Sequence, residues 1–155
     1  MTTPTGNGIF DLILGLPVHP LVVHAAVVLL PLGALAVIAL FAVKRWRVPL
    51  AWPTLGLLVV ATIAAFIART SGGHLEDRVG DPGQHAQWGG LLPFVATGFL
   101  VIAGAWLVLV ARRREGSGPI TALGAVAALA AVGVIGLTVV TGHSGSEAAW
   151  QQKIA

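Results

Sequence analysis

Cysteine is absent from this chain of 155 residues, and charged residues make up only 10% of it. The lack of cysteine excludes disulfide bonds, iron–sulfur ligation, thioether attachment of haem and thiol catalysis. An average soluble domain is about 25% charged, so this chain has too few charges to cover the surface of a soluble globule. Hydrophobic residues make up 56% of the sequence, which excludes intrinsic disorder as well.

Familiar enzyme and transporter signatures are also missing. The sequence has no Gly-x-Ser-x-Gly elbow, phosphate-binding loop, dinucleotide fingerprint or His-Glu-x-x-His motif, each of which marks a distinct chemistry. No acidic residue lies inside an apolar stretch, where it could couple ion movement. The net charge of +3 comes from Lys and Arg residues beside apolar stretches, so nucleic acid is not an expected partner.

Long apolar stretches dominate what is present. Each has the length of roughly 20 residues that crosses a bilayer as an α-helix, and each is apolar on every face. Short connections between such helices favour antiparallel neighbours. The sequence therefore predicts one all-α domain over 1–155, an integral membrane up-down four-helix bundle in a lipid bilayer. The predicted spans are 21–43, 50–69, 89–111 and 119–141.

Proline, serine and small residues indicate where the helices begin and how they pack. Asp81 is a candidate N-cap of the third helix, and the spacing of Ser144 and Glu147 predicts a capping box that opens a separate short helix. The candidate first-turn prolines are Pro20, Pro53, Pro82 and Pro119. The small residues expected to allow close helix approach are Ala25, Ala26, Ala34, Gly124, Ala125, Ala128, Gly133 and Gly136.

The distribution of Lys and Arg predicts the orientation in the membrane. These residues fill the connections 44–49 and 112–118, which lie on the same side of a four-span bundle. Because positively charged connections stay in the cytoplasm, both termini and the 70–88 connection are expected to face outward. No Lys or Arg precedes Lys44, which argues against a cleavable signal peptide.

All five histidines fall on the predicted outer side: His19, His24, His74, His85 and His143. His24 lies inside the first apolar stretch, so we expect it to be the most buried of the five and to require a partner. The first and third helices of an up-down bundle are diagonal, as are the second and fourth. This geometry pairs His24 with His85 and His74 with His143, whereas a cap or loop residue is the simpler interpretation of His19.

Imidazoles without thiols suit haem iron, copper or zinc. We therefore predict a histidine-ligated redox centre near the outer face, with His24, His74, His85 and His143 as ligands and haem b preferred over a Cu or Zn ion. Arg69 is placed either to pair with haem propionates or to anchor the interface beside Glu76 or Asp77. Two alternatives remain open: a non-redox Zn or Cu binding module, and a cofactor-free accessory or structural subunit.

Short histidine motifs recur near the ends of the predicted spans. They are His19-Pro20, Val23-His24, His85-Ala86 and Gly142-His143-Ser144-Gly145. Between Gly15 and Gly145 the chain thereby resembles a family of small bacterial membrane proteins, domain of unknown function 2231, although Ala26 stands where that family usually has proline. The resemblance implies four spans in a bacterial plasma membrane. Some relatives look fused to Rieske-type iron–sulfur domains, which implies electron transfer with a partner protein.

Overall fold

The computed structural model describes residues 12–13, 16–79, 83–114 and 117–154. Four long helices account for nearly all of them: α1 (Val18–Ala42), α2 (Lys44–Val79), α3 (Gln84–Ala111) and α4 (Gly118–Ile154). Ahead of α1, the two-residue strands β1 (Leu12–Ile13) and β2 (Leu16–Pro17) pair antiparallel, with Leu12 opposite Pro17. The predicted all-α bundle is confirmed, and this short ladder is an addition to it.

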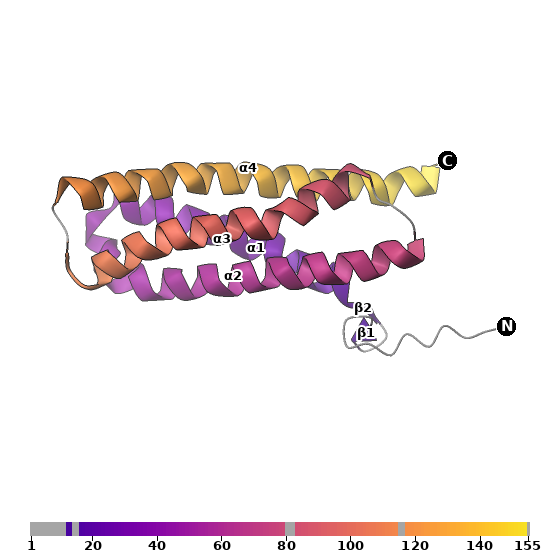
Figure 1. Ribbon diagram of the computed structural model, residues 1–155, viewed down its shortest axis with the longest axis horizontal. Coiled ribbons are helices and arrows are strands. Elements are labelled where there is room, and N and C mark those ends of the chain that lie inside the picture. The colour runs from indigo at the N-terminus through magenta and orange to yellow at the C-terminus, as the bar shows by residue number, and fades with distance from the viewer. Residues whose placement is uncertain (1–11, 14–15, 80–82, 115–116, 155) are drawn as a thin grey trace.

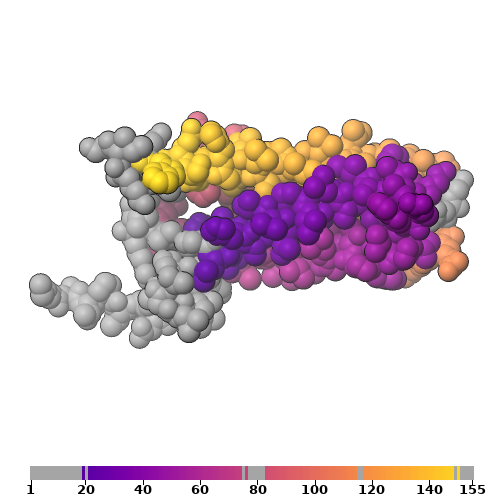
Figure 2. All heavy atoms as spheres, turned by 180° about the vertical axis from the view of Figure 1, so that it is seen from behind, coloured from indigo at the N-terminus to yellow at the C-terminus, as the bar shows by residue number. Residues whose placement is uncertain are grey.

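The helices pack in the up-down arrangement. Both α1 and α3 pack mainly against α2 and α4, so α1 and α3 are diagonal to each other (Figure 1). Figure 2 shows α1 lying between α2 and α4 along the bundle. We call the end where α1 and α3 begin the terminal end, and the end with the α1–α2 and α3–α4 connections the hairpin end.

All four helices are long and apolar enough to cross a membrane, as predicted. The candidate spans are Leu21–Ala42, Lys44–His74, Gln84–Ala111 and Gly118–Ala148. Three of them exceed the apolar stretches because the helices continue through the polar residues at both ends of the bundle. An irregular backbone in lipid leaves its polar groups without hydrogen bonds. This favours helical structure over the whole apolar stretch and into the polar residues at its ends.

Proline positions are only partly as predicted. Pro20 and Pro119 lie in the first turns of α1 and α4, which fits a residue whose missing N–H has no intrahelical partner there. Pro53 lies inside α2, so its assignment to a first turn is wrong. The N-cap of α3 is Gly83, not Asp81, which together with Pro82 lies outside the described residues.

The predicted short C-terminal helix is also wrong, because α4 runs unbroken to Ile154. Ser144 is buried within α4 and donates from Oγ to the carbonyl of Thr141, 3.0 Å away. A serine that returns its proton to its own helix in this way does not act as an N-cap. The glycines on either side of Ser144 do not stop the helix, since they too lie inside it.

Small residues set the approach of α3 and α4 near the hairpin end. Gly124 is buried, and a Cβ built on it would lie 2.6 Å from Nε1 of Trp106. A Cβ built on Gly133 or Gly136 meets nothing within 4 Å. The prediction that a small residue allows close helix approach is therefore confirmed at Gly124 and wrong at Gly133 and Gly136. Buried small residues elsewhere in the core include Ala26, Ala34, Ala127 and Ala131.

Arg47 closes the hairpin end. Its Nε donates to the carbonyl of Leu40 at 2.9 Å and its Nη2 to that of Phe41 at 2.7 Å. These are among the last carbonyls of α1, which have no partner within their own helix. The guanidinium also lies 5.7 Å from the ring centroid of Trp106, so one side chain caps α1 and contacts α3.

Candidate functional site

Two of the five histidines meet at the terminal end of the bundle. His19 is the second residue of α1 and His85 the second residue of α3, so the two come from diagonal helices. Their ring centroids are 6.4 Å apart and the rings are inclined at 72°, edge to face. Both side chains are half-buried. We refer to these two residues as the histidine pair.

His19 is held by α2. Its Nδ1 lies 2.9 Å from the carbonyl oxygen of Ala68 and 3.3 Å from Oγ of Ser71. Because a carbonyl can only accept, Nδ1 carries the proton and donates it. In the neutral ring Nε2 then keeps its lone pair, which is the form that binds metals.

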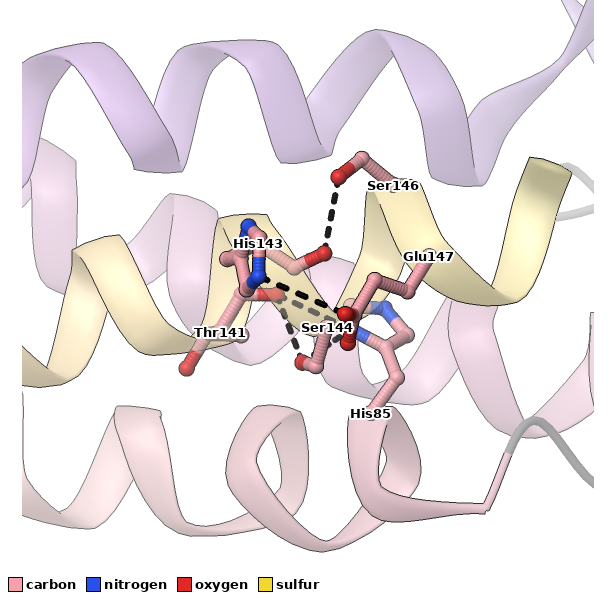
Figure 3. Close-up of polar contacts among 6 residues, drawn as sticks. All are labelled: His85, Thr141, His143, Ser144, Ser146 and Glu147. Atoms are coloured by element: carbon pink, nitrogen blue, oxygen red, sulfur yellow. Dashed lines mark hydrogen bonds and ion pairs between the residues drawn. The ribbon is translucent and has the colours of Figure 1, made fainter. Parts of the chain in front are cut away.

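His85 is held by α4 in the same way. Its Nδ1 lies 3.1 Å from the carbonyl oxygen of Thr141 and 3.5 Å from Oγ of Ser144. Figure 3 shows the ring of His85 reaching from α3 to these two groups. Nδ1 is again the donor, so both members of the histidine pair present an unprotonated Nε2 when neutral.

A glycine flanks each ring. A Cβ built on Gly72 would lie 2.9 Å from Cε1 of His19, and one built on Gly145 would lie 2.9 Å from Cε1 of His85. Real Cβ atoms do not approach other atoms so closely, so each imidazole occupies the space that a side chain would fill. Gly72 follows Ser71 and Gly145 follows Ser144, and the two Ser-Gly pairs serve as equivalent cradles on α2 and α4.

Burial lowers the pKa of His19 below its ordinary value of 6.5. The hydrogen bond to Ala68 opposes this effect, and repulsion from His85 adds to it. Desolvation disfavours the charged form of a base, so the lowered pKa keeps His19 neutral at pH 7. A neutral imidazole with a free Nε2 is the form that ligation requires.

His24 does not occupy the predicted position. Its side chain is exposed, so the expectation that it is the most buried histidine is wrong. A histidine of α1 does pair with His85 across the diagonal, but it is His19. Because α1 is apolar on every face, the sequence gives no periodicity that identifies its inward side. The structure does not test whether His24 binds a ligand.

His74 and His143, predicted to pair with each other, both have exposed side chains. Nε2 of His143 lies 3.4 Å from Oε1 of Glu147, one turn along α4 (Figure 3). Within the described residues, no three His, Asp or Glu side chains are grouped so that they could hold one metal ion. The ligand roles predicted for these two histidines remain predictions.

Arg69 lies one residue beyond Ala68, the residue whose carbonyl binds His19. Its guanidinium carbon is 4.7 Å from the ring centroid of Phe94 on α3, a distance typical of a cation–π contact. Arg69 as a whole is exposed, so its side chain is not enclosed by the bundle. Its predicted role beside an anionic cofactor group is not tested by this contact.

The sequence carries a second pattern, apart from hydropathy, that points to His19, Ser71 and Ser144. Each helical hairpin has a histidine as the second residue of its first helix and a Ser-Gly pair near the end of its second helix. The repeat is invisible to hydropathy because all four stretches are equally apolar. The histidine and the serine are 52 residues apart in the first hairpin and 59 in the second, so Ser71-Gly72 and Ser144-Gly145 correspond only in an alignment that allows a seven-residue gap.

Comparisons with known proteins place the chain in a family. No curated protein and no solved structure matches it significantly. A family model described as "Predicted membrane protein (DUF2231)" matches residues 15–155. This range contains all four helices, the histidine pair and both Ser-Gly cradles. The chain therefore belongs to the DUF2231 family of predicted membrane proteins, as the histidine motifs of the sequence indicated.

Proposed function

We propose that this protein transfers electrons in the bacterial plasma membrane through a redox centre held by His19 and His85, with haem b as the preferred cofactor. One observation carries the proposal: two imidazoles from diagonal helices lie with centroids 6.4 Å apart, and each donates its Nδ1–H to a backbone carbonyl. A histidine that ligates a metal commonly donates its other ring N–H in this manner.

The spacing of the histidine pair fits ligation of one iron. A metal–imidazole bond is about 2 Å long and the bonding nitrogen lies about 1 Å from the ring centre, so two imidazoles that share one ion would have centroids up to about 6 Å apart. The observed separation is 6.4 Å. Two neutral imidazoles are also the axial donor set that b-type haems use.

The number of donors favours haem over zinc. Structural zinc sites usually have four protein ligands and catalytic sites three, whereas the described part of the chain brings together only the histidine pair. A haem supplies four of its own nitrogen ligands and needs only two from the protein. Copper, which accepts fewer ligands than zinc, is the second candidate and is distinguished by the experiment below.

The residues around the pair have definable roles in this proposal. His19 and His85 would hold the iron, and the carbonyls of Ala68 and Thr141 keep the ring protons on Nδ1. Arg69, exposed beside this site, would pair with carboxylate groups of the cofactor. The haem, when bound, supplies one-electron redox chemistry.

The test is an absorption spectrum and metal analysis of the full chain purified in detergent after expression with added haem precursor. A Soret band with about one haem per chain supports the proposal. Colourless protein with stoichiometric copper or zinc supports the metal-binding alternative, and neither signal supports a cofactor-free subunit. His19→Ala and His85→Ala should each abolish the band. His24→Ala and His143→Ala, with exposed side chains, should retain it. Loss of haem in these two variants and in His85→Ala, with haem retained in His19→Ala, would favour the ligands predicted from sequence.

A further inference from the structure

The two helical hairpins build the same half-site twice. In the first, the imidazole of His19 meets a carbonyl, a hydroxyl and a glycine at residues 68, 71 and 72. In the second, His85 meets the same three kinds of group at residues 141, 144 and 145. The spacing along α2 and α4 is identical, and both serines are buried, at 2% and 9% exposure. Such a repetition points to a shared task for the two hydroxyls.

We propose that Ser71 and Ser144 are positioning residues that lock each member of the histidine pair in the tautomer protonated at Nδ1. Ser71 has one hydroxyl proton, and Oγ lies closer to the carbonyl of Ile67, at 2.8 Å, than to Nδ1 of His19, at 3.3 Å. The proton therefore goes to the helix carbonyl, and toward the imidazole the hydroxyl oxygen accepts.

The same proton count holds in the second half-site. Oγ of Ser144 donates to the carbonyl of Thr141 at 3.0 Å and lies 3.5 Å from Nδ1 of His85. Each Nδ1–H thus faces two acceptors, one carbonyl and one hydroxyl oxygen. Two acceptors restrict the rotation of the ring more tightly than one does. Both also disfavour the tautomer in which Nδ1 has no proton, because its lone pair would then face two oxygen lone pairs. Since the serines are buried, water cannot readily replace a lost hydroxyl.

Which nitrogen of a histidine carries the proton depends on the hydrogen bond made by the other nitrogen. Locking the proton on Nδ1 leaves Nε2 of both rings available as a ligand. The use of this lone pair by a cofactor rests on the proposed function, whereas the tautomer itself does not. The positioning role is therefore testable in protein that contains no cofactor.

The test measures imidazole nitrogen shifts by NMR on the cofactor-free full chain, labelled with ¹⁵N-histidine in detergent micelles. In the parent protein, both rings of the histidine pair should show a protonated Nδ1. In Ser71→Ala the ratio of Nε2–H to Nδ1–H forms of His19 should rise about five-fold, the effect of one ordinary hydrogen bond, while His85 stays unchanged. Ser144→Ala should give the reciprocal result.

Matched controls are available on the same helices. Thr70 and Ser146 each donate to a carbonyl of their own helix and are exposed, so Thr70→Ala and Ser146→Ala should leave both ratios unchanged. Ser71→Cys and Ser144→Cys keep the side-chain volume with a weaker acceptor, and should give intermediate ratios even if the alanine variants do not fold. Unchanged ratios in the folded serine variants, or equal changes in the controls, would overturn the proposal. Even in that case, a Soret band in the parent protein expressed with haem precursor would still support the proposed electron-transfer function.

Discussion

Gly72 lies so close to His19 that a Cβ on the glycine would come within 2.9 Å of Cε1 and 3.2 Å of Nδ1 of the ring. The atoms that would be struck belong to a rigid ring whose Nδ1 is already bonded to Ala68. The imidazole therefore cannot yield without giving up this bond. The glycine fixes where the ring can lie, and the carbonyl fixes how it is turned.

Gly72→Ala should displace His19 and weaken cofactor binding by at least about ten-fold, the loss that follows disturbance of outer-shell partners of a metal ligand. Haem titration followed by the Soret band measures this effect. Gly73→Ala is the matched control, because a Cβ on Gly73 meets nothing within 4 Å, and it should bind like the parent. Equal affinity in the two variants would show that the cradle does not position the ring.

Acid should destabilise the fold through His19. Its pKa is lowered from 6.5 by burial and, to a smaller extent, by repulsion from His85. Below pH 6.5 the unfolded chain binds a proton that the folded chain does not, so this contribution to stability is present above 6.5 and is lost as the pH falls toward the folded pKa. Thermal unfolding of cofactor-free protein, measured by circular dichroism from neutral pH downward, tests this.

The variant His19→Gln isolates that contribution. Its unfolding temperature should fall less steeply with acidification than that of the parent, because glutamine does not titrate. A parent-like slope in His19→Gln would assign the acid sensitivity to other groups.

The orientation predicted from Lys and Arg can be tested directly, because the chain has no cysteine of its own. Ser146→Cys places a single thiol near the terminal end and Ser117→Cys one near the hairpin end; both serines are exposed. If the positively charged connections are cytoplasmic, a membrane-impermeant maleimide added to intact cells should label the first variant only. Labelling of the second variant alone would put the histidine pair on the cytoplasmic side.

The bundle could be predicted from sequence, but the centre of the site could not. Four apolar stretches of spanning length leave few arrangements for a short chain, and the up-down bundle is the simplest. The sequence favours a cap or loop residue at His19, which lies outside the apolar run and beside Pro20. The helix nevertheless begins at Val18, since proline is well tolerated in a first turn, and this early start carries His19 to the bundle.

The prediction that His24 points into the bundle is wrong for a related physical reason. In a soluble helix the polar side marks the surface, but a lipid-facing surface is as apolar as the core, so hydropathy does not say which way a residue points. Contacts between small residues and large rings carry that information instead. Two such contacts are those of Gly72 with His19 and of Gly124 with Trp106. Each joins residues on different helices, so it follows from the three-dimensional packing and cannot be read from the sequence.

Gly124 offers the sharpest test of the packing. Its missing Cβ would lie 2.6 Å from Nε1 and 2.8 Å from Cε2 of Trp106, a side chain only 1% exposed. Gly124→Ala should therefore destabilise the bundle by about 1–3 kcal/mol through overpacking, despite the better helix propensity of alanine. Gly136→Ala on the same helix, where a Cβ meets nothing within 4 Å, should be neutral or stabilise by up to about 1 kcal/mol. Unfolding in mixed SDS–detergent micelles, followed by tryptophan fluorescence, gives both values, and a Gly124→Ala variant as stable as Gly136→Ala would show that α3 and α4 do not approach this closely.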